Sequence, residues 1–313
     1  MQDQVLLKYN ARTYKDPGEK WEVAHLCLNL LNKLLSEYEP GPEDFKGGSA
    51  SVGVAPGFFI MSHLHQTSLL LRTTLFLIDE VRTLLDTFTL FPGKEKLEGA
   101  VSTALTLLET GLRLSDSFIS GARSAGASEV FTDLAKLLLG LNPRSGRPDH
   151  LFNVSRFILY GYWLPGARLS AVKIIRDVAA SPANQASILA TFTASELIQQ
   201  SVLKAFTEAL DADKVEDADM DSDEAEGKDH AGATRLAIMD LLLTGVMMSA
   251  PSVAHFLLGF DLRLGVGKSQ LQPPSVCGVR SYLHALLALH PAPACNDLSA
   301  PLSGSLQAHS YIS

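Results

Sequence analysis

The segment Gly265-Val266-Gly267-Lys268-Ser269 has the residue types with which the end of a phosphate-binding loop holds a nucleotide. Such a loop also needs a glycine five positions before Gly267, where this chain has Leu262. It lies between a strand and a helix, because backbone amides and the helix N-terminus hold the phosphates. Here a helical pattern precedes the segment, and Pro273 and Pro274 follow it. The sequence therefore does not predict a nucleotide site.

A second candidate is a calcium loop, because Asp219, Asp221 and Asp223 alternate as the first ligands of such a loop do. The loop requires a glycine at its sharp turn and a bidentate glutamate at its last position. This chain has Glu224 and His230 at those two positions. The three aspartates are therefore interpreted as part of a solvated acidic insertion.

Histidines are the remaining candidates for metal or acid–base chemistry. His63 and His65 are two positions apart, so a helix would direct them to different faces. His284 and His290 have no base–nucleophile partner in the sequence, and the Gly-x-Ser-x-Gly pattern of hydrolases is absent. We expect no catalytic, cofactor-binding or metal-binding residues, no cofactor and no enzymatic activity. No partner-binding residue is identified either.

Charge is concentrated in one stretch of the chain. The net charge is −8, and residues 211–229 contain ten acidic residues against Lys214 and Lys228. The rest of the chain is therefore neutral, and it has no basic stripe of the kind that binds nucleic acid. We expect no direct contact with nucleic acid, and we interpret residues 211–230 as an acidic disordered loop.

The cysteines and the apolar stretches indicate in which kind of compartment the protein resides and whether it could span a membrane. The cysteines Cys27, Cys277 and Cys295 are few and widely spaced, which indicates buried thiols in a reducing compartment. The longest apolar stretch, Leu236 to Met248, contains Asp240 and is shorter than the roughly 20 residues that span a membrane. The sequence predicts a soluble protein without a transmembrane segment.

Apolar residues recur at helical spacing along most of the chain. The first strong pattern follows Asp16-Pro17-Gly18-Glu19, which has the spacing of a capping box, and it ends before Pro40. Further helices are predicted at about 59–88 (as two helices), 94–114, 128–141, 149–160, 166–180, 184–191, 195–210, 231–249, 253–258 and 279–289. Aromatic residues on the apolar faces are predicted to be core: Trp21, Phe131, Phe157 and Phe256.

The succession of helices, with no period-two pattern that would indicate strands, predicts an all-α fold. No fixed repeat is visible, so the prediction is an irregular α-solenoid of stacked helices without a sheet. Residues 1–210 form one helical solenoid segment, the acidic loop covers 211–230, and residues 231–290 continue the solenoid. Residues 291–313 are rich in Ala, Pro and Ser and are predicted to be a disordered tail.

Several stretches, taken in their order and spacing, resemble one family. They are Lys20-Trp21-Glu22-Val23-Ala24, Leu34-Leu35-Ser36-Glu37-Tyr38-Glu39-Pro40, Glu43-Asp44-Phe45, Pro56-Gly57-Phe58, Phe91-Pro92-Gly93-Lys94, Gly140-Leu141-Asn142-Pro143-Arg144, Asn153-Val154-Ser155-Arg156 and Pro251-Ser252-Val253-Ala254-His255-Phe256-Leu257-Leu258-Gly259-Phe260. Together they resemble the middle of the giant scaffold nucleoporin of the nuclear-pore inner ring. The resemblance covers about residues 17–290.

The resemblance implies an irregular solenoid of HEAT-like and armadillo-like helix groups within a much longer chain. It implies a structural role in the nuclear pore complex at the nuclear envelope, in support of nucleocytoplasmic transport. The implied partners are other inner-ring nucleoporins, including linker nucleoporins that bind through short linear segments. Because the chain begins and ends inside the family's pattern, we expect a fragment or a truncated product.

A soluble transport receptor or adaptor of the karyopherin type is the alternative function, because it is also a helical solenoid. Such a receptor would show helix pairs recurring near every 40 residues with a shared inner face. The sequence shows no such recurrence, which favours the scaffold interpretation.

Overall fold

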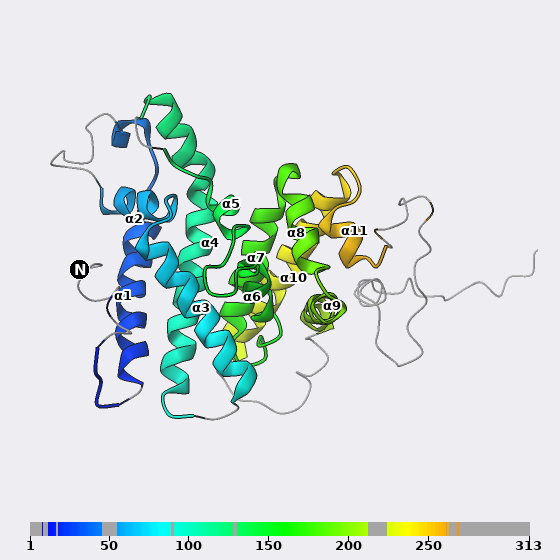
Figure 1. The fold of residues 1–313 in the computed structure, drawn as a ribbon, viewed down its shortest axis with the longest axis horizontal. Coiled ribbons are helices and arrows are strands. Elements are labelled where there is room, and N and C mark those ends of the chain that lie inside the picture. The colour runs from blue at the N-terminus through cyan, green and yellow to red at the C-terminus, as the bar shows by residue number, and fades with distance from the viewer. Residues whose placement is uncertain are drawn as a thin grey trace, which may run out of the picture.

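The fold was established with a computed structural model. It describes residues 8, 12–16, 18–45, 55–88, 91–127, 130–211, 224–260, 262 and 268, with the side chains of 211 and 224–229 left out. Helices in two layers make up the structure (Figure 1), and no strand occurs in these ranges. The predicted all-α stack of helices is confirmed. No helix in this part of the chain is long and apolar enough to cross a membrane.

One layer consists of long helices that lie side by side. They are α1 (Glu19–Ser36), α4 (Lys94–Ser124), α7 (Pro165–Ala179) and α10 (Glu224–Val246). In Figure 1 they follow one another from the blue end of the molecule to the yellow end, and α1 packs on α4, α4 on α7, and α7 on α10. Each helix of this layer therefore contacts its neighbours in the stack, which is how a solenoid extends.

The second layer covers one side of the first. Its helices are α3 (Leu69–Thr87), α6 (His150–Arg156) and α9 (Glu196–Asp211), which also pack in sequence, α3 on α6 and α6 on α9. Between the layers α3 contacts α4, α6 contacts α7, and α9 contacts α10. Shorter elements complete the turns: η2 (Pro42–Phe45), α2 (Pro56–Leu64), α5 (Leu134–Leu138), η3 (Pro182–Asn184), α8 (Gln185–Phe192) and α11 (Val253–Leu257).

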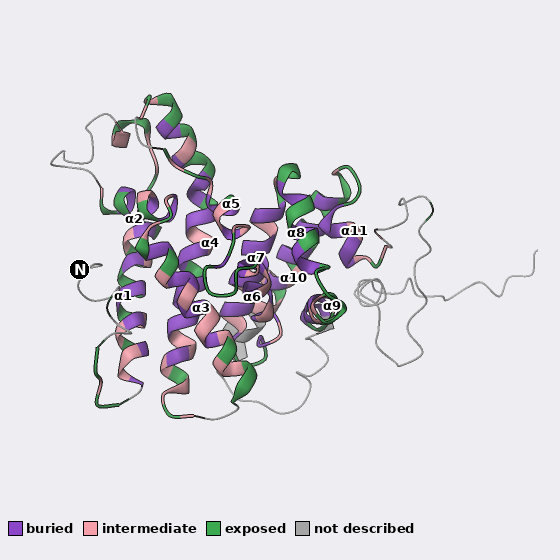
Figure 2. Cartoon of the chain, viewed as in Figure 1, coloured by how far each residue is buried: buried purple, intermediate pink, exposed green. Residues whose placement is uncertain are grey.

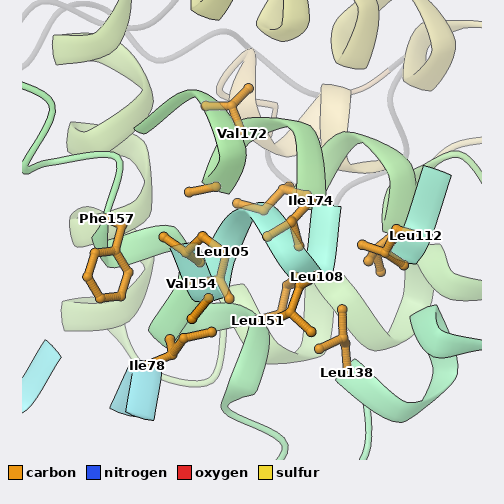
Figure 3. Packing of buried hydrophobic residues seen from close by; sticks show 14 of the residues in the cluster. Ile78, Leu105, Leu108, Leu112, Leu138, Leu151, Val154, Phe157, Val172 and Ile174 are labelled. Carbon is orange, nitrogen blue, oxygen red and sulfur yellow. The ribbon is translucent and has the colours of Figure 1, made fainter. Parts of the chain in front are cut away.

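The core lies between the two layers and continues through the stack. Figure 3 shows apolar side chains from α3, α4, α5, α6 and α7 directed toward one another. Those labelled there are Ile78, Leu105, Leu108, Leu112, Leu138, Leu151, Val154, Phe157, Val172 and Ile174. Burying each such side chain contributes about 1.5–3 kcal/mol, so the layer interface carries much of the stability. Exposed residues lie mostly at helix ends and in connections (Figure 2).

Local signals explain where several helices begin and end. The apolar pattern at 59–88 forms two separate helices, α2 and α3, as predicted. At the start of α3, the side chain of Ser68 accepts a hydrogen bond from the amide of Leu71. At the end of α11, Gly259 has a φ of 86°, which suits glycine at a helix C-terminus. The amide of Phe260 then donates to the carbonyl of His255 at 3.0 Å.

The helix predicted at 128–141 is wrong. Among the described residues of this range only α5 is helical, because Thr132 donates its amide to the carbonyl of His65 at 2.8 Å and Asp133 caps the amide of Ala135 at 3.0 Å. Val130 and Leu141, near the two ends of that predicted helix, are 85% and 69% exposed. These long-range and capping bonds fix an extended segment before α5, which helical periodicity does not reveal.

Other boundaries differ from the prediction in detail. Helix α9 begins at Glu196, and the hydroxyl of Ser195 accepts a hydrogen bond from the amide of Ile198. The hydroxyl of Thr193 instead donates back to the carbonyl of Leu189. Helix α4 continues ten residues beyond the predicted Leu114.

The C-terminal boundaries are partly outside the described ranges. Helix α10 starts at Glu224, seven residues before the predicted start near Ala231, so the end of the acidic segment is helical in this structure. The predictions for residues 212–223, for the phosphate-loop-like segment, for the helix at 279–289 and for the tail lie outside the described residues, of which only Lys268 falls within these segments.

Candidate interaction surface

The candidate catalytic and metal residues do not come together. His63 is exposed, whereas His65 is buried at the end of α2, as expected for residues on different faces of one helix. The ring of His65 stacks on Phe118 at 5.2 Å, and its Nδ1 donates to the carbonyl of Thr132 at 2.9 Å. Burial lowers the pKa of His65, and this residue is part of the core, not of a site. No group of three potential metal ligands occurs in the described part of the chain.

The predicted aromatic core residues are placed as follows. Trp21, Phe157 and Phe256 are buried, and Phe131 is partly buried against the same core. They take part in aromatic contacts across elements, such as Trp21 with Phe91 at 6.0 Å and Phe256 with Phe192 at 6.1 Å. Their role is packing.

A groove of about 650 Å³ lies between α3 and the segment around α5, and we call it the α3–α5 groove. Its residues are Thr67, Leu69, Leu71, Arg72, Thr73, Leu75, Phe76, Asp79, Leu137, Leu141, Asn142, Pro143, Arg144 and His150. Leu71 and Leu75 are buried, whereas Leu69 and Leu141 are 55% and 69% exposed. Apolar side chains at an open groove are typical of a surface that receives a partner's apolar side chain.

The loop after α5 forms one wall of the groove and is held by its own polar groups. The side chain of Asn142 accepts from the amide of Arg144 at 3.0 Å and donates to Asp149 at 2.8 Å. The amide of Gly146, with a φ of 65°, donates to the carbonyl of Asn142 at 2.8 Å. These bonds make the wall rigid before any partner arrives.

Arg144 joins this wall to α3. Its guanidinium lies 4.6 Å from the ring centre of Phe76, and its Nη1 donates to Asp79 at 3.0 Å. Arg72 stands at the rim, is exposed, and has no ion pair within the described ranges. The groove therefore combines an apolar floor with two arginines, of which Arg72 carries an uncompensated charge.

Carboxylates on α3 also bind α6. Asp79 accepts from Asn153 at 3.1 Å, and one helical heptad further on Asp86 accepts from Arg156 at 2.9 Å and from the hydroxyl of Tyr160. Burial and the bond to Asp86 raise the pKa of Tyr160. Asn153 and Arg156 belong to a stretch that carries the family resemblance, and here they hold the second layer together.

Comparison with known proteins agrees with this architecture. A family model described as nuclear pore complex scaffold, nucleoporins 186/192/205, matches residues 1–296. The chain belongs to this family. It is 33% identical over 299 residues to the human nuclear pore complex protein Nup205, covering 92% of the chain and 15% of that protein. It is 36% identical over 211 residues to the Nup205 of Drosophila melanogaster, covering 67% of the chain and 10% of that protein.

Membership in the Nup186/192/205 family accounts for the resemblance read from the sequence. The chain nevertheless spans only about 15% of the length of its human relative. The relatives' names identify them as nuclear pore complex proteins, and the match extends over both helical layers. The α3–α5 groove was not found by sequence reasoning, since Leu141 was predicted within a continuous helix and its exposure follows only from the break after α5.

Proposed function

We propose that the chain is a structural segment of the inner ring of the nuclear pore complex at the nuclear envelope, where it supports nucleocytoplasmic transport without catalysing a reaction. The observation that carries this proposal is the match of residues 1–296 to the scaffold family, combined with a two-layer stack of helices. In such a stack each unit packs on the next, so a long chain of this kind provides length and rigidity.

We further propose that the partners are other inner-ring nucleoporins, including linker nucleoporins that bind through linear segments. The α3–α5 groove supports this because it offers an apolar floor, exposed leucines at both sides and a rigid wall. Arg72 would attract an acidic residue beside the apolar anchor of such a segment, since Arg144 is already paired with Asp79. The expected occupant is a short segment with one or two large apolar side chains and a neighbouring carboxylate.

The test is a capture experiment from nuclear envelopes with identification of the captured proteins by mass spectrometry. The wild-type chain is compared with Leu141→Asp, which places a charge in the groove, and with Leu197→Asp as a matched control on α9, where the leucine is 80% exposed. We expect inner-ring nucleoporins to be captured by the wild type and by Leu197→Asp, with a linker nucleoporin lost from Leu141→Asp.

The two parts of the proposal fail separately in this experiment. If the wild type captures transport cargo and no inner-ring nucleoporin, the scaffold function is wrong. If Leu141→Asp captures the same linker nucleoporins as the wild type, the scaffold function stands and the groove is not their binding site.

A further inference from the structure

The α3–α5 groove follows one side of α3 from Leu69 to Asp79, a helical length of about 15 Å. The residues that α3 contributes to this wall are three or four positions apart and therefore share one side of the helix: Leu69, Arg72, Thr73, Phe76 and Asp79. A helix of about three turns has the same length, whereas an extended segment crosses it in about five residues. The groove is thus long enough for a short helix.

The backbone of the opposite wall is already hydrogen-bonded within the loop after α5. The amide of Asn142 donates to the carbonyl of Arg147 at 2.8 Å, and the amide of Arg144 donates to the side chain of Asn142 at 3.0 Å. The amide of Gly146 donates to the carbonyl of Asn142, and Pro143 has no amide hydrogen. In the part of the chain that the structure describes, no strand borders the groove. An extended segment therefore has no strand edge with which to pair.

The conformation of an occupant follows from these walls. A segment that lies on apolar side chains has to satisfy its own backbone groups when the surface offers no partners, because a buried unpaired amide or carbonyl is unfavourable. An α-helix does this, since its amides donate to carbonyls of the same segment. It also directs side chains three or four positions apart to one side, so that two large apolar residues enter the groove together.

Charge at the groove determines the polar side of such a helix. Arg72 is exposed at the rim and has no ion pair within the described ranges. Asp79, the carboxylate in the lining, already accepts hydrogen bonds from three side chains, at 3.2, 3.0 and 3.1 Å: Arg82, Arg144 and Asn153. The uncompensated charge at the groove is therefore positive, and it attracts a carboxylate beside the apolar side chains of the occupant.

We propose that the α3–α5 groove binds an acidic amphipathic helix of a partner protein. Two large apolar side chains, one turn apart on that helix, contact Leu69 and Leu141 on the opposite walls, and a neighbouring carboxylate pairs with Arg72. Leu69 and Leu141 are 55% and 69% exposed, so one helix removes both from water. This inference rests on the proposed role of the groove as a docking site and adds the conformation and the charge of the occupant.

Selection from a phage-displayed library of random peptides, each of about 14 residues or four helical turns, tests the proposal on the full chain. The library is selected on the immobilised wild type and counter-selected on Leu141→Asp. We expect enriched peptides to have large apolar residues at steps of three and four, with Asp or Glu beside them. A synthetic copy of one such peptide should bind Leu141→Asp at least about tenfold more weakly than the wild type. Leu197→Asp, on α9, should keep wild-type affinity.

Charge reversal at Arg72 tests the acidic character of the occupant. On Arg72→Glu, the selected peptides should carry Lys or Arg beside the apolar residues. The peptide selected on the wild type should bind this variant about three- to tenfold more weakly, as expected for an ion pair at the rim of a contact. Arg72 and Leu141 are both exposed, and melting curves that match the wild type's verify that the variants are folded.

Other outcomes contradict the proposal. Apolar residues at every second position of the peptides would mean that the occupant is extended. Unchanged peptide charge on Arg72→Glu would mean that the occupant is not selected for acidity, and no enrichment over Leu141→Asp would mean that the groove binds no such segment. If acidic helical peptides depend on Leu141 while the chain captures no inner-ring nucleoporin, this inference stands and the proposed scaffold function is wrong.

Discussion

Replacement of Phe118 tests the packing at one end of the stack. Its side chain is fully buried in α4, and its ring lies 5.1 Å from Phe131, 5.2 Å from Phe45 and 5.8 Å from Phe58. Together with the stacked ring of His65 at 5.2 Å, these contacts join η2, α2 and the segment before α5 to α4. Phe118→Ala therefore removes the contact that these elements share.

The cost can be estimated from the burial. A phenylalanine that is 0% exposed loses about 3–5 kcal/mol of stability when it is truncated to alanine, because its transfer energy is lost and a cavity remains. For a chain of this size each kcal/mol lowers the melting temperature by about 1.5–2 °C, so a loss near 4 kcal/mol corresponds to about 6–8 °C. Phe118→Leu keeps most of the volume and should cost about 1.5 kcal/mol or less.

The assay is thermal and urea unfolding followed by circular dichroism, with Phe88→Ala as the control. Phe88 lies at the end of α3 and is 52% exposed, so its truncation should change stability by less than about 0.5 kcal/mol. The reasoning is refuted if Phe118→Ala melts within a degree or two of Phe88→Ala, because that result would mean that the aromatic cluster does not hold these elements.

Further predictions concern pH, the acidic segment, α11 and the other end of the stack. Burial lowers the pKa of His65 and His150 below the ordinary 6.5, so the unfolded chain binds more protons between the folded pKa and 6.5, and stability should fall as pH drops from 7.5 to 5.5. His65→Gln should reduce that fall in melting temperature; an unchanged pH slope would contradict the shift. Deletion of residues 213–223, before α10, should leave the melting temperature within about 2 °C of wild type, since loop length changes closure entropy by only about 0.6 kcal/mol per doubling. A drop of many degrees would show that this segment is docked. Phe256→Ala and Leu257→Ala, at 3% and 0% exposure, should each cost about 2–5 kcal/mol in urea unfolding, and wild-type midpoints for both would rule out a core role. On α1, Leu26 and Leu30 are 60% and 42% exposed, so replacing both with Lys should lower self-association measured by light scattering, and an unchanged mass distribution would exclude this face.

Helical periodicity was a good guide wherever apolar residues repeat over several turns. The pattern through Trp21, Leu28 and Leu35 predicts the buried side of α1, and all three side chains are 5% exposed or less. The order of stretches along the chain also identified the family, which the match of residues 1–296 confirms. Helical periodicity is a local property of the chain, and the family resemblance depends only on the order of stretches along it. Both can therefore be read from a single sequence.

Features that depend on distant partners were not predictable. Val130 and Leu141 have helical spacing but are exposed. The bonds from Thr132 to His65 and from Asp133 to Ala135 end the periodic pattern before α5, and the bond from the Asn142 amide to the Arg147 carbonyl belongs to the loop that follows α5. The α3–α5 groove depends on Asp79 holding Arg144, a contact 65 residues apart in sequence. The arrangement in two layers depends on which helices pack their apolar faces together. Periodicity predicts the apolar face of each helix, but it does not predict which other helix packs against that face.

The central claim is that this chain is a stationary part of the nuclear pore and not a carrier that moves through it. It is tested most directly by expressing the chain with a fluorescent tag and measuring recovery after photobleaching at the nuclear envelope. Our account predicts a punctate nuclear rim whose fluorescence recovers far more slowly than that of a transport receptor measured in the same cells. Diffuse fluorescence, or a rim signal that recovers as fast as the receptor, would contradict it.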